Sequence, residues 1–157
     1  MLELARKHKA RFIFAGSSSV CYDMYANPYA FSKQIGENYC TLWNRRYGVS
    51  VAIARFFNVY GPREPVNQTV LGVFIEQCRS NLPLTITGDG TQRRDFIHVS
   101  DIVSGLIAMS ERDWSARIFD LGTGINYSIN QIAAMFKNHP ISYIPRPSGE
   151  AETTLAN

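Results

Sequence analysis

Two residues four positions apart, Tyr29 and Lys33, form the first pattern in this sequence that could do chemistry. Asn27 and Pro28 precede them, as expected at the start of a helix, and residues four apart on a helix share a face. A free phenol has a pKa of about 10, but a nearby ammonium group favours its ionised form. The pair could therefore transfer protons, although the same spacing also occurs on ordinary helix surfaces.

Three consecutive hydroxyl side chains, Ser17, Ser18 and Ser19, follow an apolar run that is typical of a buried strand. Ligands of open α/β sheets bind beyond the carboxyl ends of the strands. The serines are therefore candidates for holding a substrate hydroxyl against Tyr29, and the alternative is a polar turn. A strand, serines and a helix with Tyr29 and Lys33 together favour a catalytic site.

The elements that must position these groups alternate along the chain. Apolar runs predict strands within 11–16, 49–57, 82–88, 94–99 and 117–122. Helices are predicted over 2–9, 29–47, 69–81, 101–109 and 128–138. Asn27, Ser100 and Ser128 are the expected N-terminal caps, and Gly48 is an expected C-terminal cap. Strands that alternate with helices predict an α/β fold with a doubly wound sheet.

The composition is that of one globular unit, with 157 residues of which 45% are hydrophobic and 18% charged. A net charge of +3 is too small to indicate nucleic acid or a membrane, but it suits an anionic small ligand. The three cysteines are far apart and in no metal-ligand spacing. No apolar run reaches the roughly 20 residues that span a bilayer. We expect a cytoplasmic protein without a metal, in which 1–157 form one domain and the part from about residue 60 forms a smaller lobe.

A series of motifs along the chain resembles, in the same order, those of one known family. The motifs are "FIFAGSSSV", "NPYAFSKQIGE", "ARFFNVYGP", "PLTITGDGTQRRDFIHVSDI", "FDLGTG" and "PRPSGE", the last followed by "TLA". They resemble the extended short-chain dehydrogenase/reductases, within the NAD-dependent epimerase/dehydratase group that acts on nucleotide sugars. The resemblance implies a partial, Rossmann-like parallel sheet with a small C-terminal substrate-binding lobe. It also implies NAD as cofactor and a nucleotide-diphosphate sugar as substrate.

The resemblance implies a role for each matching residue near the cofactor. Tyr29 would be the catalytic acid/base, and Lys33 would be its partner and hold the nicotinamide ribose. Ser17 matches the catalytic Ser/Thr, and Phe57 matches a residue that lines the nicotinamide pocket. These four residues are the expected cofactor contacts.

Further matching residues would bind the substrate. Asn58 matches an amide on the diphosphate side, and Arg94 matches an arginine that grips the diphosphate, whose oxygens suit a guanidinium fork. Arg146 and Glu150 match a later pair around the nucleotide.

Structural alternatives exist for these charged residues. Arg94 could form a surface ion pair with Asp95 or Asp89, and Arg146 could be a solvated loop charge. His98, at a strand end, is expected to be structural and not a base.

The residues after Ser17 bear on the type of reaction. Dehydratases and decarboxylases of this group usually carry acidic residues there, whereas this chain has Ser18 and Ser19, which are also expected to contact substrate. The resemblance therefore favours epimerisation of a UDP-hexose through a transient keto-sugar, and a 4,6-dehydratase is the less favoured alternative.

The sequence departs from the family pattern in two ways. The glycine-rich turn of the dinucleotide site has no counterpart, so we expect a C-terminal portion that is truncated at the N-terminus and also at the C-terminus. The loop between Ser17 and Tyr29 is short, with "VCYD" in place of "VYG". We expect weak NAD binding by this chain alone, and self-association as a homo-oligomer or pairing with a separately encoded N-terminal half. A non-catalytic remnant that binds a nucleotide sugar or a partner is the alternative.

Overall fold

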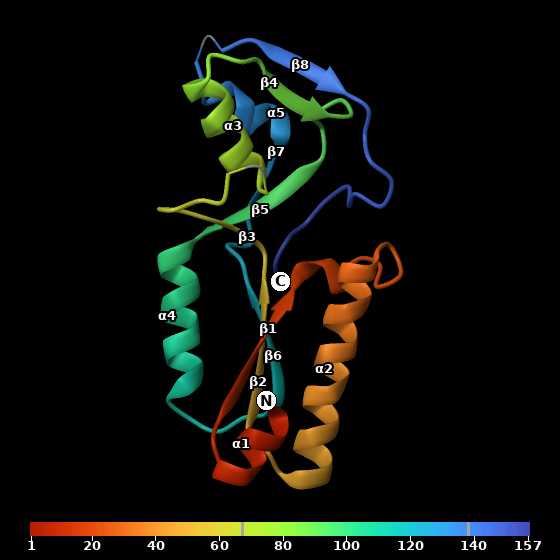
Figure 1. The fold of residues 1–157 in the computed structure, drawn as a ribbon, viewed down its shortest axis with the longest axis vertical. Coiled ribbons are helices and arrows are strands. Elements are labelled where there is room, and N and C mark those ends of the chain that lie inside the picture. Colours follow the sequence, from red (N-terminus) through yellow and green to blue (C-terminus); the bar gives the residue numbers. More distant parts are fainter. Residues whose placement is uncertain (67, 138) are drawn as a thin grey trace.

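The large lobe is built on a parallel sheet of three strands in the order β1–β2–β6. The computed structural model describes residues 1–66, 68–137 and 139–157. The large lobe contains α1 (Leu2–His8), β1 (Phe12–Ser17), α2 (Pro28–Tyr47), β2 (Val51–Phe56), α4 (Val99–Ser110) and β6 (Ser115–Leu121). Figure 1 shows α2 and α4 on opposite sides of the sheet. This arrangement confirms the predicted α/β fold with a partial doubly wound parallel sheet.

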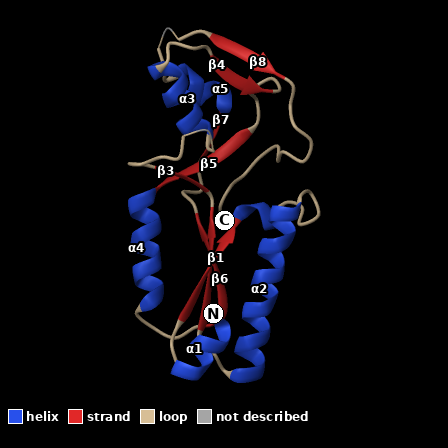
Figure 2. Ribbon diagram, in the orientation of Figure 1, coloured by secondary structure: helices blue, strands red, loops and turns tan. Residues whose placement is uncertain are grey.

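The small lobe packs two helices beside a parallel pair of strands (Figure 2). It contains α3 (Val70–Arg79), β4 (Leu84–Thr87), α5 (Ile129–Ala134) and β8 (Ile141–Ile144). Its buried core consists of Phe74, Leu84, Ile86, Ile129, Ile132 and Ala133. The role of this lobe in binding substrate stays a prediction.

A second sheet of three strands joins the two lobes. It contains β3 (Asn58–Tyr60), β5 (Arg93–His98) and β7 (Asn126–Ser128), with β5 in the middle. After β5 the chain returns to the large lobe through α4 and β6, and then re-enters the small lobe at β7. The small lobe is therefore discontinuous in sequence.

The central strand β2 carries the core of the large lobe on both of its faces. Val51 and Ile53 pack on one face with Cys40 of α2, whereas Ala52 and Ala54 pack on the other with Met109 of α4. Successive side chains of a strand point to opposite faces. A continuous apolar run is thus what a strand covered by helices on both sides requires.

Helix α2, which carries Tyr29, begins and ends where the sequence predicts. Asn27 Oδ1 accepts a hydrogen bond of 2.9 Å from Ala30 N, and Gly48 ends the helix with a φ of 66°. A glycine in the middle of the helix, Gly36, allows close contact with the sheet, because a Cβ there would lie 2.2 Å from the ring of Phe14. Both ends of α2 are local signals, whereas Gly36 serves tertiary packing.

The predicted cap of α4 is wrong, and the predicted cap of α5 is confirmed. Helix α4 is capped by His98, whose Nδ1 accepts from Ser100 N at 3.3 Å, so Ser100 lies inside the first turn. This gives His98 the structural role expected for it. Ser128 caps α5 through a capping box with Gln131. The helix ends at Ala134, and the predicted end at Asn138 lies outside the described residues.

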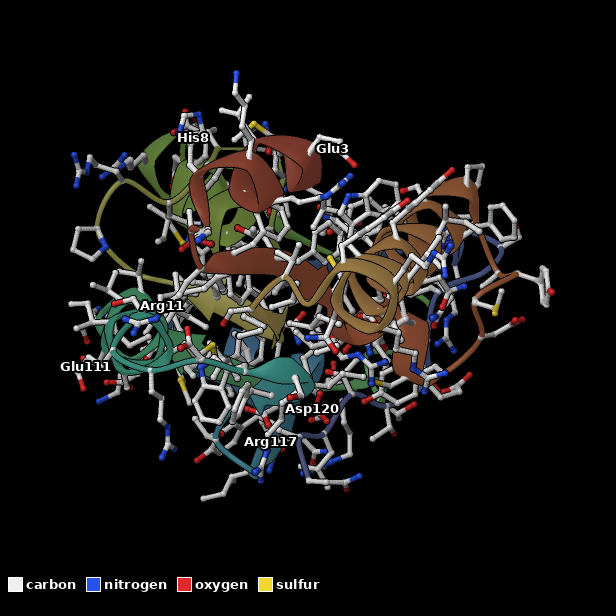
Figure 3. The ribbon with its side chains drawn as sticks, turned by 90° about the horizontal axis from the view of Figure 1, so that it is seen from below. Glu3, His8, Arg11, Glu111, Arg117 and Asp120 are labelled. Atoms are coloured by element: carbon white, nitrogen blue, oxygen red, sulfur yellow. The ribbon has the colours of Figure 1, made fainter. Side chains whose placement is uncertain are left out.

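The two outer strands of the large sheet are β1 and β6. Figure 3, seen from below, again places α2 and α4 on opposite sides of this sheet. Arg11, labelled there, joins the start of β1 to the end of α4 by donating to Asp113 Oδ1 at 3.0 Å and to Ser110 O at 2.8 Å. Within the described residues, no strand pairs with the outer edge of β1.

Among all the residues that the structure describes, no helix has both the length and the apolar composition that a membrane span requires.

Candidate active site

A cavity of about 870 Å³ brings together five of the residues that the sequence analysis singled out. They are Tyr29, Phe57, Asn58, Arg94 and Glu150. Its walls come from the start of α2, the segment 57–65, the first turns of α3, and strands β4 and β5. A cavity of this size accommodates a small organic ligand.

Tyr29 and Lys33 lie on one face of α2, as their spacing predicts. Tyr29, in the first turn, is 56% exposed, and Lys33 Nζ lies 5.6 Å from the centroid of its ring. Lys33 Nζ also donates a hydrogen bond of 2.9 Å to the carbonyl of Ala15 in β1. This bond fastens the lysine of α2 to the neighbouring strand, and the ammonium keeps two further donor hydrogens.

The three serines lie at the end of β1 but outside the cavity wall. Ser17 and Ser18 are buried, and Ser17 Oγ accepts from the backbone N of Ser19 at 3.2 Å and from its hydroxyl at 2.9 Å. Among the described residues that line the cavity, none of the three serines is present. No direct hydrogen bond joins Ser17 to Tyr29 in the described part of the chain. The structure thus places the two candidate groups on neighbouring elements, and no hydrogen bond between them is present among the described residues.

Arg94 and Arg146 converge on one carboxylate. Arg94 Nη2 lies 2.8 Å from Glu150 Oε1, and Arg146 Nε lies 3.4 Å from Glu150 Oε2. Arg146 also pairs with Glu152. Burial lowers the pKa of Arg94, whereas the hydrogen bond to Glu152 raises the pKa of Arg146. Arg94 and Arg146 are thus balanced by the carboxylates of Glu150 and Glu152, and the Arg94 guanidinium keeps donor hydrogens that its present contacts do not use.

The partners considered for Arg94 from sequence, Asp95 and Asp89, are engaged elsewhere. Asp89 accepts two hydrogen bonds from Thr91, which lower its pKa. Asp95 is fully buried and accepts from Thr123 N at 2.9 Å and Gly124 N at 3.0 Å. The ion pair of Arg94 with Glu150 therefore replaces both alternatives.

Asn58 has a structural role that sequence analysis missed. Its Nδ2 donates at 3.0 Å to Asp95 O and at 3.0 Å to Thr154 Oγ1. Asp95 also accepts from Ala156 N at 3.1 Å, so the segment around Thr154 is held against β5. The burial of Asp95 could have been predicted from the sequence. Asp95 and the apolar Ile97 lie two positions apart on β5, so their side chains share one face of the strand, which is buried.

A buried ion pair that sequence analysis also missed holds α2 on the sheet. Arg55 of β2 donates to both carboxylate oxygens of Glu37, with Nε–Oε1 at 2.9 Å and Nη2–Oε2 at 2.7 Å. The Glu37 side chain is 3% exposed and that of Arg55 is 18% exposed. The hydrogen bonds to Glu37 raise the pKa of Arg55. This bidentate pair fixes the helix that presents Tyr29 to the cavity.

The donor groups near β1 fit one end of a dinucleotide cofactor. Lys33 offers two donor hydrogens for ribose oxygens, and the exposed phenol of Tyr29 is beside it. Phe57 is buried at the cavity wall and provides an apolar surface. These residues fit the nicotinamide-ribose end of NAD, whereas the sequence contains no glycine-rich turn of the type that holds a pyrophosphate.

Comparison with known proteins points to one family. The sequence model described as "NAD dependent epimerase/dehydratase family" matches residues 1–122. A "Putative UDP-glucose 4-epimerase" of Methanocaldococcus jannaschii is 34% identical over 160 residues, which cover 91% of this chain and 51% of that protein. UDP-glucuronic acid decarboxylase 1 of Xenopus tropicalis is 34% identical over 155 residues, covering 87% of this chain and 37% of that protein.

Solved structures show the same similarity at the level of the fold. A UDP-glucuronic acid 4-epimerase from Bacillus cereus, in complex with UDP-glucuronic acid and NAD, superposes with a TM-score of 0.90 and is 28% identical. The match covers 99% of this chain and 55% of that chain. The 157 residues thus span about half, or less, of the length of these relatives.

Proposed function

Because this chain belongs to the NAD-dependent epimerase/dehydratase family, we propose that it is the catalytic and substrate-binding part of a nucleotide-sugar epimerase. The substrate is a UDP-hexose, and the reaction proceeds through a transient keto-sugar. The observation that carries this proposal is that Tyr29 and the Arg94–Glu150 pair line one cavity. A proton-transfer group and an anion-binding group are thus available to one ligand.

Tyr29 is the proposed acid/base. As a phenolate it accepts the proton of a sugar hydroxyl, and as a phenol it later returns a proton to the keto oxygen. Lys33 supports the ionised form because its ammonium lies beside the ring. Ser17 is proposed to orient the sugar through its hydroxyl group from the end of β1, next to the cavity wall and not within it, with Ser18 and Ser19 beside it.

Arg94 and Arg146 are proposed to hold the diphosphate. Their guanidinium groups already face Glu150, which keeps them in position when no anion is bound. Glu150 and Asn58 are proposed to contact the nucleotide side of the substrate. Fixing the diphosphate at one end of the cavity orients the sugar at the other, toward Tyr29.

NAD is the proposed cofactor, and it would supply the hydride acceptor and donor for the sugar carbon. Tyr29, Lys33, Ser17 and Phe57 would hold its nicotinamide-ribose end. The pyrophosphate cradle is proposed to come from residues outside the 157, in the same polypeptide or in a second one. The unpaired outer edge of β1 supports this, because strands added there would extend the sheet.

Epimerisation is favoured over elimination by the residues that follow Ser17. Water elimination and the handling of a carboxylate call for an acid, whereas Ser18 and Ser19 do not ionise at neutral pH. Relatives named as epimerases and as decarboxylases match this chain at the same identity, so the identity itself does not separate the two reactions. The hydroxyl side chains are what support the epimerase.

The test combines this chain with an N-terminal segment that contains the glycine-rich turn, and adds NAD and a panel of UDP-hexoses. We expect an epimeric UDP-sugar, detected by chromatography or NMR, only when both parts and NAD are present. Release of CO₂ from UDP-glucuronic acid, or loss of water from a UDP-hexose, would contradict the epimerase proposal. Binding of UDP without turnover of any sugar would favour the alternative, a non-catalytic binding unit.

The proposal for the cofactor has a separate test. We expect this chain alone to bind NAD with a dissociation constant weaker than micromolar, because contacts to the pyrophosphate are missing. Isothermal titration that gives a micromolar constant for the 157 residues would overturn it. Light scattering tests the free edge of β1, since self-association is expected when no second segment covers that edge.

A further inference from the structure

The loop between Ser17 and Tyr29 links two candidate catalytic groups that lie on neighbouring elements. It leaves β1 through a short 3-10 helix, η1 (Ser18–Cys21), and then runs to the start of α2. Its internal hydrogen bonds are local, such as the one from Tyr25 N to Asp23 Oδ1 at 2.8 Å. The end of β1 and the first turn of α2 are therefore positioned in part by what holds this loop from outside.

Among the described residues, two side chains of this loop form hydrogen bonds to distant parts of the chain. Cys21 Sγ accepts from Arg55 Nη1 at 3.5 Å, and sulfur is a weak acceptor. Tyr22 Oη accepts from Leu155 N at 2.7 Å and donates to Leu155 O at 3.4 Å. The contact between Tyr22 and Leu155, which spans 133 positions in sequence, is thus the stronger of the two attachments.

Leu155 belongs to a segment that is itself fixed on β5. Thr154 N donates to Arg93 O at 3.0 Å, and Thr154 Oγ1 accepts from Asp95 N at 3.1 Å. Ala156 N donates to the buried carboxylate of Asp95 at 3.1 Å, and Ala156 is 7% exposed. Because both neighbours of Leu155 are held in this way, its peptide groups offer the loop a fixed point of attachment.

The same two segments also meet at a second place. Gly149 has a φ of 78°, and a Cβ there would lie 2.9 Å from the carbonyl oxygen of Ala26. The positive φ and the close approach both favour glycine at this position. The segment 149–156 therefore contacts the loop at Tyr22 and at Ala26, and Figure 1 shows it reaching the end of β1 from the small lobe.

We propose that Tyr22 is a positioning residue, whose hydroxyl group ties the loop between Ser17 and Tyr29 to the segment 149–156 and thereby sets the geometry of these two groups. This inference rests on the proposed function, in which Tyr29 transfers protons and Ser17 orients the sugar. Tyr22 is absent from the described residues that line the cavity, so it acts through the loop and not through substrate. The stretch "VCYD", where the sequence departs from the family pattern, thus acquires a role.

The expected effect follows from the loss of a single hydrogen bond. Without the Tyr22 hydroxyl, Leu155 N loses its acceptor and the loop loses the stronger of its two distant attachments. A misplacement of reacting groups by about 1 Å can lower a rate by about 100-fold. Binding of the diphosphate at Arg94 does not depend on this loop, so the defect should appear in kcat and not in affinity.

Hydrogen exchange of the 157-residue chain tests the attachment without any substrate. Tyr22→Phe removes only the hydroxyl, and Tyr22 is 42% exposed, so we expect the variant to fold. Backbone amides of 18–26 should exchange about 2- to 10-fold faster than in the unaltered chain, whereas those of β4 in the small lobe should not change.

Tyr25→Phe is the matched control for this experiment. Tyr25 lies in the same loop and is 76% exposed, and its hydroxyl forms no hydrogen bond among the described residues. Its variant should therefore exchange at the same rate as the unaltered chain.

Kinetics of the combined enzyme test the positioning. We expect kcat of Tyr22→Phe to fall by about tenfold, while KM for the UDP-sugar and the affinity for UDP stay unchanged. The value of kcat is referred to the UDP-binding sites counted by calorimetry, so that unfolded chains do not contribute to the loss. A merely structural role would leave kcat per binding site unchanged. Tyr25→Phe should keep the full kcat.

Three results would contradict the inference, and they have different meanings. Unchanged exchange of 18–26 in Tyr22→Phe would show that the hydroxyl does not hold the loop. Faster exchange with an unchanged kcat would show that the loop is held but does not position the catalytic groups, and the proposed function would stand. If the combined enzyme has no epimerase activity, or if Tyr29→Phe is fully active, the proposed function fails and the positioning role fails with it.

Discussion

Arg94 Nη2 and Glu150 Oε1 lie 2.8 Å apart although 56 positions separate the two residues in the chain. Arg94 belongs to β5, and Glu150 belongs to the loop that follows β8. Both line the cavity whose wall also includes Tyr29. The ion pair thus fixes the Arg94 guanidinium in the wall of the cavity that also includes a group that could transfer protons.

The first prediction concerns the proposed acid/base. Tyr29→Phe removes the hydroxyl and keeps the ring, so we expect kcat of the combined enzyme to fall by about 10²- to 10⁴-fold. The affinity for UDP should change little, and folding should be unaffected because Tyr29 is 56% exposed. Tyr39→Phe is the control, since Tyr39 lies on the same helix, is 52% exposed and is outside the cavity. Full activity of Tyr29→Phe would refute the assignment.

The second prediction concerns the geometry of the proposed diphosphate site. Arg94→Lys keeps the charge but loses the planar fork, so we expect the dissociation constant for UDP to rise by about tenfold or more. Arg11→Lys, at the opposite end of the large lobe, should leave it unchanged. An unchanged affinity of Arg94→Lys for UDP would contradict the prediction, because it would show that the planar guanidinium is not needed for binding. Titration calorimetry with UDP provides the comparison.

The third prediction concerns the stability of the large lobe. Arg55→Met leaves the carboxylate of Glu37 buried without its partner, and we expect the free energy of unfolding to fall by about 3 kcal/mol. Arg11→Met breaks an exposed pair with Asp113 and should cost less than about 1 kcal/mol. Urea denaturation measures both values. Similar losses of unfolding free energy in the two variants would mean that the buried Arg55–Glu37 pair stabilises the fold no more than the exposed Arg11–Asp113 pair does.

The fourth prediction concerns pH. Burial raises the pKa of the Cys40 thiol to about 11 from an ordinary value of 9.0. The protonated thiol is neutral, so the folded chain holds this proton more tightly than the unfolded chain does. The resulting stability is present below about pH 9 and is lost as the pH rises toward 11, with a slope of up to about 1.4 kcal/mol per pH unit.

Cys40→Ala isolates this contribution from other groups that titrate in the same range. We expect the free energy of unfolding of this variant to depend less steeply on pH between 9 and 11 than that of the unaltered chain. Cys78→Ala retains Cys40 and should keep the steeper dependence. Parallel slopes in all three proteins would contradict the prediction.

Local signals in the sequence were sufficient for most of the elements. Helix α2 begins after Asn27 and ends at Gly48 as predicted, and Ser128 caps α5 as predicted. A cap depends on hydrogen bonds within one turn, so nearby residues are enough to predict it. The error at α4 is also local, since both His98 and Ser100 can accept from a helix N-terminus. Residue type cannot decide between two capping side chains that lie two positions apart, because the decision depends on where β5 ends.

Contacts between distant segments were not predictable in the same way. The ion pair of Arg55 with Glu37 and the burial of Asp95 depend on how α2 and the C-terminal segment pack on the strands. The partner of Arg94 is a further case, because Asp95 and Asp89 are closer in sequence than Glu150 is. Arg94 and Asp95 are consecutive residues of β5, so their side chains point to opposite faces of the strand. Nearness in sequence therefore predicts the wrong ion-pair partner.

The sequence by itself determined the order of the helices and of the longer strands, the ends of α2, the family resemblance and the helical pairing of Tyr29 with Lys33. It did not predict the short strands β3, β7 and β8. Only the tertiary structure decided which side chains share a cavity. It brought Arg94 and Glu150 to the cavity wall with Tyr29 and joined the hydroxyl groups of Ser17 and Ser19 by a hydrogen bond. The physical reason is that backbone propensities and caps act over a few residues. The position of a buried side chain and the identity of its hydrogen-bond partners depend on every segment that packs around it.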